Sequence, residues 1–308
     1  MTTVLVLGMY ALLVGFVTPP VLRHRWAQRL PRLAIASWLI LSISFITSVV
    51  LAAVALAAPW ALLWSPPVAN GARDPASIEP AISGALSSAL GMMVVVGVIL
   101  QVCRHLVRER LRSHRGGSQH EAMVAAVGRP DPTLGAVVLD HAAPAAYCLP
   151  GRCHRVVVTR GAVATLTPEQ LQAVLAHERA HLHSHHHLIV GTAHALARAL
   201  PWVPLLRQAS DEVAVLAEMA ADDAAARRHD RCTLADALMI CARVAVRPMG
   251  LTAGGPAAAT RVRRLLRPSR SPGPAGRVGL ALGVAMLLIP VAVCCVPLVA
   301  LGCEWLTR

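Results

Sequence analysis

Four long segments without a charged side chain constrain the fold of this 308-residue chain more than any other feature. They comprise residues 1–22, 33–64, 80–103 and 278–303. An α-helix needs roughly 20 consecutive apolar residues to cross the hydrocarbon core of a bilayer, and each segment is long enough. The first segment has neither a basic start nor a small-residue cleavage site, so it is read as a retained helix and not as a signal peptide. The sequence therefore predicts an α-helical membrane protein with about four transmembrane helices.

The net charge of +13 comes mainly from arginines that lie beside these segments. If successive helices alternate in direction, three arginine clusters lie on one side, which the positive-inside rule places in the cytoplasm. Such arginines also contact anionic lipids, so membrane lipids are expected partners and direct binding of nucleic acid is not expected. The predicted location is the bacterial plasma (inner) membrane, with several passes and both ends outside. The clusters are Arg23, Arg25, Arg29 and Arg32; Arg104, Arg108, Arg110, Arg112 and Arg115; and Arg261, Arg263, Arg264, Arg267, Arg270 and Arg277.

This topology divides the chain into three parts. Residues 1–106 are predicted to hold three transmembrane helices, residues 107–275 a cytoplasmic domain, and residues 276–308 the fourth helix with a short external tail. Within the cytoplasmic part, β-branched runs at 135–140 and 154–160 predict two strands. The segment 146–151 joins these strands, and 113–120 is predicted to be a loop.

A helix is predicted to start after Thr167. Thr167 suits the N-cap, Pro168 the first helical position, and Gln170 completes a capping box. On this helix His177 and His181 lie one turn apart.

His177, Glu178 and His181 form an H-E-x-x-H motif on that helix. Two imidazoles at positions i and i+4 can reach one zinc ion, and the glutamate between them can take a proton from a zinc-bound water. A chance match in a chain with 14 histidines is the alternative. The motif predicts a catalytic zinc site in the cytoplasmic part.

A site of this type needs a third protein ligand and an open fourth position. Glu218 and Asp222 lie at i and i+4 in an alanine-rich helix that is expected to begin near Asp211. Glu218 could bind zinc, and Asp222 could accept a hydrogen bond from a histidine ligand. Glu212 and Asp223 are competing candidates, and an ordinary solvated acidic face is the remaining alternative.

Four further histidines, His183, His185, His186 and His187, crowd the end of the first helix. His185 would continue the i+4 series from His181, but a zinc ion with three protein ligands and a water has no room for it. We expect the other three to meet lipid headgroups or solvent. A second metal site in this tract is the alternative.

The nearly apolar segment 188–206 follows, but the predicted zinc ligands on either side of it must meet at one ion. The segment therefore returns to the side from which it starts. It either lies in the membrane interface or enters the membrane and turns back at Pro201 and Pro204. His194 and Arg198 favour a shallow or protein-buried path.

Three stretches, "LTPEQLQAVLAHERAHLHSHHHL", "AYCLPGRCHRVVVTRG" and "EMAADDAA", resemble the BlaR/MecR-type membrane metallopeptidases, the gluzincin family that includes β-lactam sensor-transducers. The order of three spans, a zinc domain and a fourth span is similar too. The resemblance implies a cytoplasmic α+β zincin-like metalloprotease domain inserted before the last helix. It also implies one Zn²⁺ ion bound by His177, His181 and Glu218, Glu178 as general base, and Asp222 supporting a ligand.

The resemblance also bears on substrate binding. "AYCLPG" is similar to the edge strand against which such enzymes lay an extended substrate. "GPAAATRVRRLL" resembles a segment of the HtpX relatives that would make Arg261 a candidate for stabilising the oxyanion. Gly255 stands where that segment has a histidine, so a lipid-facing Arg261 is the alternative.

The implied function is a zinc endopeptidase that cuts a cytoplasmic or membrane-proximal protein, with a BlaI-type transcriptional repressor as the expected substrate. The sensor-transducers carry a penicillin-binding domain after the last span, whereas only a few residues follow residue 303 here. We therefore expect no covalent antibiotic sensing by this chain. The alternatives are an HtpX-like quality-control protease and a non-catalytic zinc-binding membrane scaffold.

Overall fold

The computed structural model describes residues 2–63, 78–149, 155–245 and 256–267, with a few positions between 285 and 293. Two of its helices are long and apolar enough to cross a membrane, at Pro31–Ala57 and Ala85–Val127. A bent pair, Thr2–Val17 with Pro19–Arg29, would make a third span. The long apolar helices support a membrane protein. The predicted fourth span falls mostly outside the described residues.

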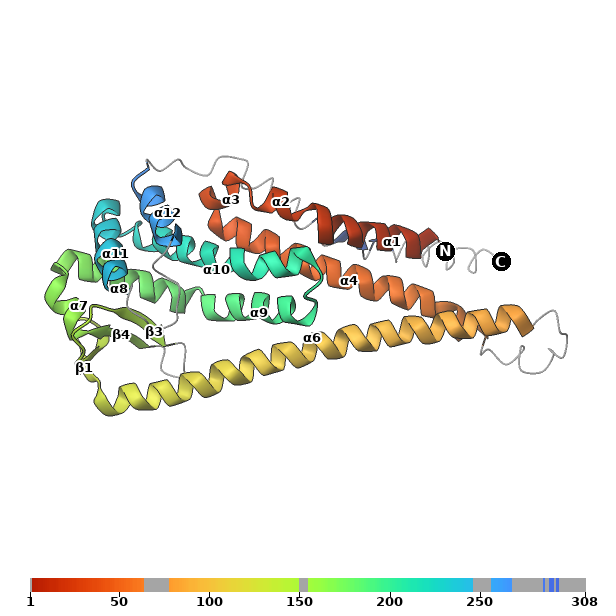
Figure 1. Ribbon diagram of the computed structural model, residues 1–308, viewed down its shortest axis with the longest axis horizontal. Helices are drawn as coiled ribbons and strands as arrows, with labels where there is room; N and C mark the ends of the chain where they lie inside the picture. Colours follow the sequence, from red (N-terminus) through yellow and green to blue (C-terminus); the bar gives the residue numbers. More distant parts are fainter. Residues whose placement is uncertain are drawn as a thin grey trace, which may run out of the picture.

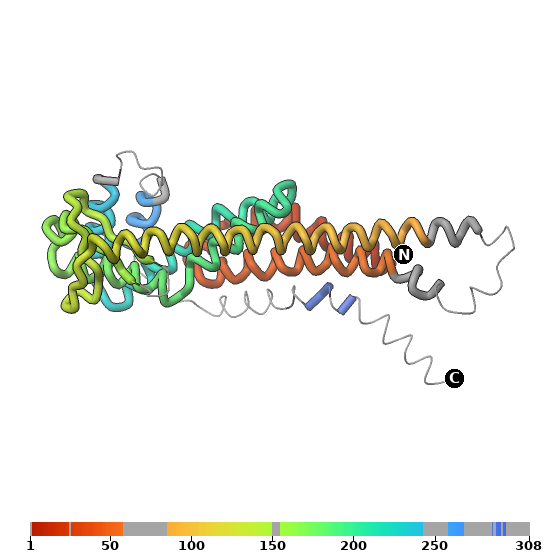
Figure 2. Tube along the Cα trace, turned by 90° about the horizontal axis from the view of Figure 1, so that it is seen from below, coloured from red at the N-terminus to blue at the C-terminus, as the bar shows by residue number. Residues whose placement is uncertain are grey.

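This bent pair consists of α1 (Thr2–Leu12), a π-helical turn η1 (Leu13–Val17), α2 (Pro19–Leu22) and α3 (Arg25–Arg29). It lies beside α4 (Pro31–Leu63), which in turn packs along α6 (Ile78–Val127), as both views show (Figures 1 and 2). The start of α1, the end of α4 and the start of α6 lie at one end of the molecule, remote from the sheet (Figure 1).

The loop predicted at 113–120 is wrong, because α6 continues without a break as far as Val127. The runs on either side of it, 104–112 and 121–127, are rich in Arg, Glu, Leu and Ala, which favour helix, and the pair Gly116–Gly117 between them does not interrupt the helix. The predicted domain boundary at 106/107 therefore lies inside a single helix. As a result, α6 connects the apolar bundle rigidly to the sheet (Figure 1).

The sheet has four strands in the order β1-β2-β4-β3. Strands β2 and β4 are parallel, whereas β1 and β3 pair antiparallel with their neighbours. Both strands predicted from β-branched runs are present, and the segment between them supplies β3 at the sheet edge. The bounds are β1 Arg129–Asp131, β2 Ala136–Leu139, β3 Ala146–Leu149 and β4 Arg155–Thr159.

Successive side chains of β4 point to opposite faces of the sheet. Val156 and Val158 pack with Leu171 and Leu175, whereas Val157 packs with Val124 of α6. One face of the sheet is thus covered by α8 (Pro168–His183), and the other by the end of α6. A short helix α7 (Arg160–Thr165) links β4 to α8.

The predicted start of α8 is confirmed in detail. Thr167 is the N-cap, and its side-chain oxygen accepts a hydrogen bond from the backbone N–H of Gln170. The side-chain oxygen of Gln170 in turn accepts a hydrogen bond from the backbone N–H of Thr167. Pro168 occupies the first turn. These local bonds fix where α8 begins, and thereby where its histidines lie along the helix.

The segment after α8 forms a helical hairpin, α9 (His186–Ala199) and α10 (Pro204–Ala225). The chain reverses between α9 and α10 at residues 200–203, as one of the two predicted paths requires, and the side chain of Trp202 at the turn is 67% exposed. The hairpin packs on α4 and α6. His194 and Arg198 are exposed, so a protein-buried path for these two side chains is wrong.

The expected start of the second helix near Asp211 is also wrong, because α10 begins at Pro204, which is pre-organised for the first turn. Leu205 and Leu216 of α10 share one core with Val14 and with Trp38 of α4. The helix that carries Glu218 is therefore part of the same packed unit as the first two spans. The last described helices are α11 (Arg231–Ala245) and α12 (Pro256–Leu265).

Candidate metal centre

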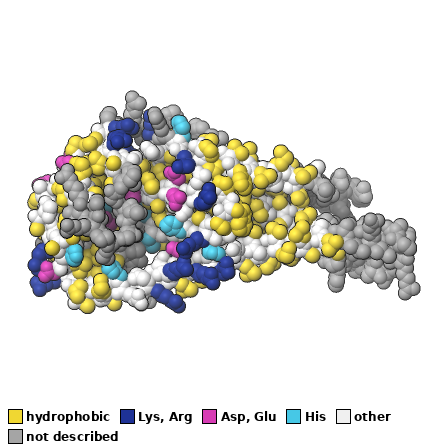
Figure 3. Space-filling view, viewed as in Figure 1, with side chains coloured by type: hydrophobic (Ala, Val, Ile, Leu, Met, Phe, Trp, Pro, Cys, Tyr) yellow, Lys and Arg dark blue, Asp and Glu magenta, His cyan; other side chains and the backbone are white. Residues whose placement is uncertain are grey.

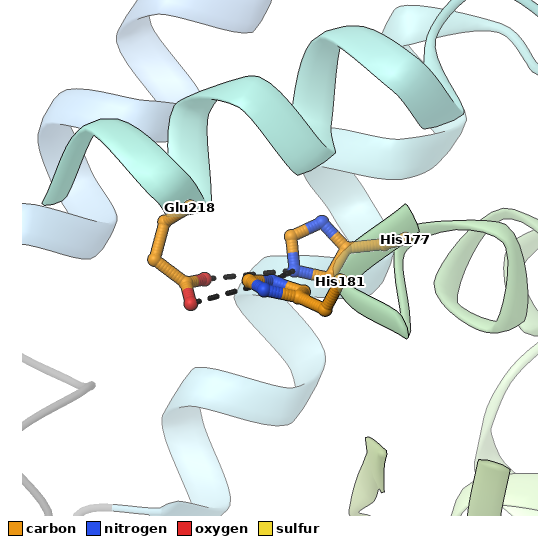
Figure 4. A group of neighbouring side chains, drawn as sticks. All are labelled: His177, His181 and Glu218. Atoms are coloured by element: carbon orange, nitrogen blue, oxygen red, sulfur yellow. Dashed lines mark hydrogen bonds and ion pairs between the residues drawn. The ribbon is translucent and has the colours of Figure 1, made fainter. Parts of the chain in front are cut away.

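Helices α8 and α10 bring His177, His181 and Glu218 to one point (Figure 4). The Nε2 atoms of the two imidazoles lie 3.1 Å apart. The Glu218 carboxylate places one oxygen 3.5 Å from His177 Nε2 and the other 3.4 Å from His181 Nε2. His177 is 4% exposed, whereas the Glu218 side chain is 41% exposed. The group is thus anchored in the interior and open on one side.

These separations fit a zinc ion. Four ligands held tetrahedrally at about 2.0–2.1 Å from zinc lie about 3.3 Å from one another. The two imidazole nitrogens are 3.1 Å apart, and each lies 3.4–3.5 Å from one of the two Glu218 oxygens, which is close to that value. Imidazole nitrogens and carboxylate oxygens are ligands that zinc binds. The exposed side of the Glu218 carboxylate leaves room for a further ligand.

Asp222 supports the first histidine from behind. Its side chain is 0% exposed, and its Oδ1 atom lies 3.1 Å from His177 Nδ1. Burial alone would raise the pKa of Asp222, but hydrogen bonds from Arg261 and the contact with His177 hold it below its ordinary value. A carboxylate anion in this place orients the ring so that Nε2 faces the metal position.

Arg261 of α12 holds both acidic residues of α10. Its Nε and Nη2 atoms donate to Asp222 at 2.8 and 2.7 Å, and its Nη1 atom lies 2.8 Å from Glu218 Oε2. The alternative of a lipid-facing Arg261 is wrong, since its side chain is only 11% exposed and is turned into the site. The segment at 256–267 therefore belongs to the metal centre.

The protonation of the ligands follows from these contacts. Burial would raise the pKa of Glu218, but its neighbours His177 and Arg261 lower it to about 2. Burial would lower the pKa of His177, but Asp222 and Glu218 raise it to about 9 when no metal is bound. Burial and the neighbouring His177 lower the pKa of His181 to about 4. At neutral pH, Glu218 is an anion and His181 is neutral, and both are ready to bind a cation.

Glu178 lies between the metal ligands and the edge strand. Burial raises its pKa to about 7, partly offset by the proximity of His177. The thiol of Cys148 on β3 lies near this carboxylate, and burial together with the Glu178 charge raises the pKa of Cys148 to about 12. A carboxylate with a pKa near neutrality can both accept and return a proton.

The competing acidic residues lie elsewhere. Glu212 pairs with Arg23 at 2.8 Å, and Asp223 pairs with Arg264. Asp223 follows Asp222 by one residue and so points about 100° away around the helix. The two competitors therefore tie α10 to α2–α3 and α12, and take no part in the ligand cluster.

The expectation for His186 is wrong. Its side chain is 5% exposed, and its Nδ1 atom lies 3.0 Å from His181 Nδ1. The expected continuation of the i+4 series to His185 is wrong too, because α8 ends at His183 and His185 adopts a left-handed backbone with φ of 50°. The sequence did not predict the contact of His186 with His181, because that contact depends on the end of α8 and the left-handed backbone at His185. His183 is exposed, as expected, and His185 is exposed as well.

One comparison with known proteins, a match to a family model, agrees with this geometry. The search of curated proteins and the search of solved structures give no match. The matching family model covers residues 111–212, about a third of the chain, and so includes α8 with the H-E-x-x-H motif and ends before Glu218. It supports the zinc-metallopeptidase part of the predicted resemblance and leaves the BlaR/MecR type without support. The family that residues 111–212 of this chain resemble is Peptidase family M48.

Proposed function

We propose that this chain is a membrane-bound zinc endopeptidase. The observation that carries the proposal is the convergence of His177 and His181 from α8 with Glu218 from α10, at separations that suit tetrahedral zinc. The match to Peptidase family M48, a family of zinc-dependent enzymes, supports it independently.

The proposed residues divide the chemistry between them. His177, His181 and Glu218 would hold the ion, which supplies a Lewis acid for the scissile carbonyl and an acidified water. Glu178 would accept a proton from the attacking water and return it to the leaving amine. Burial keeps the pKa of Glu178 at about 7, which suits both directions of transfer.

The substrate is proposed to bind as an additional strand on β3. This strand lies at the edge of the sheet, and its Cys148 side chain reaches the Glu178 carboxylate. A peptide paired with β3 would therefore pass directly over the general base. The preferred substrate is a cytoplasmic repressor of the BlaI type, and broad degradation of misfolded membrane proteins is the alternative.

Arg261 is proposed to position the site rather than to bind the oxyanion. Its Nε, Nη1 and Nη2 atoms all contact carboxylate oxygens of Asp222 and Glu218. A guanidinium group engaged in this way has no nitrogen left that is free of a carboxylate, so its contribution is to hold the α10 carboxylates in place.

A cytoplasmic position for the centre is proposed as well. Arg23 and Arg264 lie at the end of the apolar bundle where the metal ligands are, and they bind groups of α10 and α3. Charged side chains gather over that wider end, whereas hydrophobic side chains predominate on the described surface where the molecule narrows (Figure 3). The positive-inside rule then favours the inner face of the plasma membrane.

The decisive experiment compares Glu178→Gln with Glu169→Gln, a matched change at an exposed glutamate in the first turn of the same helix. Cleaved N-termini are identified by proteomics in cells that express each chain, and zinc content is measured on the purified proteins. We expect Glu178→Gln to abolish cleavage with about one zinc per chain retained. Glu169→Gln should behave as the wild type. Cleavage that persists in Glu178→Gln would refute the proposal.

A further inference from the structure

We propose that His186 is a positioning residue that fixes the tautomer of the metal ligand His181. The proposal rests on the proposed metal site and concerns a histidine outside the H-E-x-x-H motif. His186 Nδ1 lies 3.0 Å from His181 Nδ1, and the two ring centroids are 4.8 Å apart at an interplanar angle of 85°. Two imidazole nitrogens at this distance share one proton, so one ring donates and the other accepts.

The direction of this hydrogen bond follows from the other nitrogen of His181. Nε2 of His181 faces His177 Nε2 at 3.1 Å and a Glu218 oxygen at 3.4 Å, and so points to the metal position. A nitrogen that binds zinc carries no proton, and a neutral imidazole has only one. The proton of His181 is therefore on Nδ1, and His181 donates to Nδ1 of His186.

The two ligand rings thus have different neighbours at Nδ1. His177 directs Nδ1 to the buried carboxylate of Asp222, at 3.1 Å from Oδ1. His181 directs Nδ1 to the neutral ring of His186, whose own proton then lies on Nε2. The negative charge of Asp222 beside His177 makes the His177 ring the stronger electron-pair donor to the metal. His186, by contrast, orients His181 without adding a charge.

The backbone between α8 and α9 makes this contact possible. On a continuous helix, a residue five positions after His181 would lie about 140° around the axis from it and could not reach its ring. The left-handed conformation of His185, with φ of 50°, ends α8 and starts α9 at His186. The ring of His186 is thereby placed against His181 in the interior, with 5% exposure.

The test uses the full-length chain in detergent and three variants. His186→Leu removes the acceptor and keeps an apolar side chain of similar reach. His186→Asn keeps an acceptor, because its Oδ1 atom is as many bonds from the backbone as Nδ1 of histidine. His183→Leu is the matched control, since His183 is an exposed histidine of the same tract. The dissociation constant for zinc is measured by competition with a chromogenic chelator.

We expect His186→Leu to weaken zinc binding about 10–100-fold, as loss of such a supporting contact does elsewhere. His186→Asn should stay within a few-fold of the wild type, and His183→Leu should match it. Unchanged zinc affinity in His186→Leu would overturn the inference. Equal losses in the Leu and Asn variants would overturn it too, since they would show that the ring is needed only for packing.

Two further cases separate failure of this proposal from misfolding of a variant and from failure of the proposed function. If His186→Leu does not fold, His186→Gln replaces it. The side-chain oxygen of glutamine lies one bond farther from the backbone than Nδ1 of histidine and so cannot take its place. If the Gln variant then binds zinc as tightly as the Asn variant, the proposal is contradicted. If the wild type binds zinc tightly but cuts nothing, the proposed function fails while the role of His186 still stands on the affinity measurements.

Discussion

Arg261 and Asp222 form a bidentate ion pair in the interior, with Nε 2.8 Å from Oδ2 and Nη2 2.7 Å from Oδ1. Asp222 is 0% exposed, so water cannot solvate its carboxylate if Arg261 is removed. It joins α12 to the helix that carries Glu218. The stability of the chain and the geometry of the metal centre therefore depend on the same contact.

The first prediction concerns this ion pair. Arg261→Met should lower the free energy of unfolding by about 3–5 kcal/mol, because it leaves a buried carboxylate without its cation. Arg263→Met, at an exposed arginine of the same helix, should change it little. The double variant Arg261→Met/Asp222→Asn should recover part of the loss. Denaturant titration measures all four chains, and equal stability of Arg261→Met and Arg263→Met would contradict the prediction.

Arg264 gives the second prediction. Its Nε atom donates to the backbone carbonyl of Gln28 at 2.6 Å, and its Nη2 atom pairs with Asp223. Arg264→Met should loosen α12 from α3 and α10, and reduce the amide-exchange protection of residues 256–267 about tenfold. Protection of β2 should not change. Arg267→Met, at an exposed position of the same segment, is the control. An equal loss of amide-exchange protection in Arg267→Met would show that the contacts of Arg264 do not hold α12 in place.

The third prediction concerns the pH dependence of zinc binding. Without metal, the pKa of His177 is about 9, so zinc must displace a proton from this ring below that pH. The pKa of His181 is about 4 and that of Glu218 about 2, so neither adds a proton near neutrality. Zinc affinity should therefore rise about tenfold per pH unit between about pH 7 and 9 and then level off.

Competition with a chelator at controlled pH measures this dependence. Asp222→Asn removes one of the three carboxylates that raise the pKa of His177, and the one with the largest effect, so the rise in affinity should move to lower pH. A zinc affinity that is flat between pH 7 and 9 in the wild type would mean that His177 is already neutral there.

The fourth prediction uses the thiol on the edge strand. The pKa of Cys148 is raised to about 12, so at pH 8 only about one thiol in ten thousand is ionised. Iodoacetamide should label Cys148 at least about tenfold more slowly than the exposed Cys232. Glu178→Gln should speed the labelling of Cys148, whereas Glu169→Gln should not. Mass spectrometry of each cysteine peptide gives the rates, and fast labelling of Cys148 in the wild type would show that β3 does not lie against Glu178.

Much of this architecture depends on short-range patterns and could be predicted. The length of the apolar segments predicts the long helices of the bundle, and β-branched runs predict β2 and β4. Thr167 with Gln170 predicts the start of α8. The loop predicted at 113–120 was wrong because extending a helix that is already formed avoids a new nucleation step, and this saving exceeds the roughly 1 kcal/mol that Gly116 and Gly117 each cost in a helix interior. The predicted fourth span and the cytoplasmic location stay predictions.

The sequence by itself determined which two imidazoles share a helix face, because a spacing of four residues has the same geometry on any α-helix. It also narrowed the third ligand to a few acidic residues. Only the tertiary structure decided the rest. The packing of α10 across α8 separates Glu218 from Glu212 and Asp223, α12 brings Arg261 to the carboxylates, and the left-handed turn at His185 places His186 against His181. These outcomes depend on how elements far apart in the chain pack together, and local periodicity carries no information about that packing.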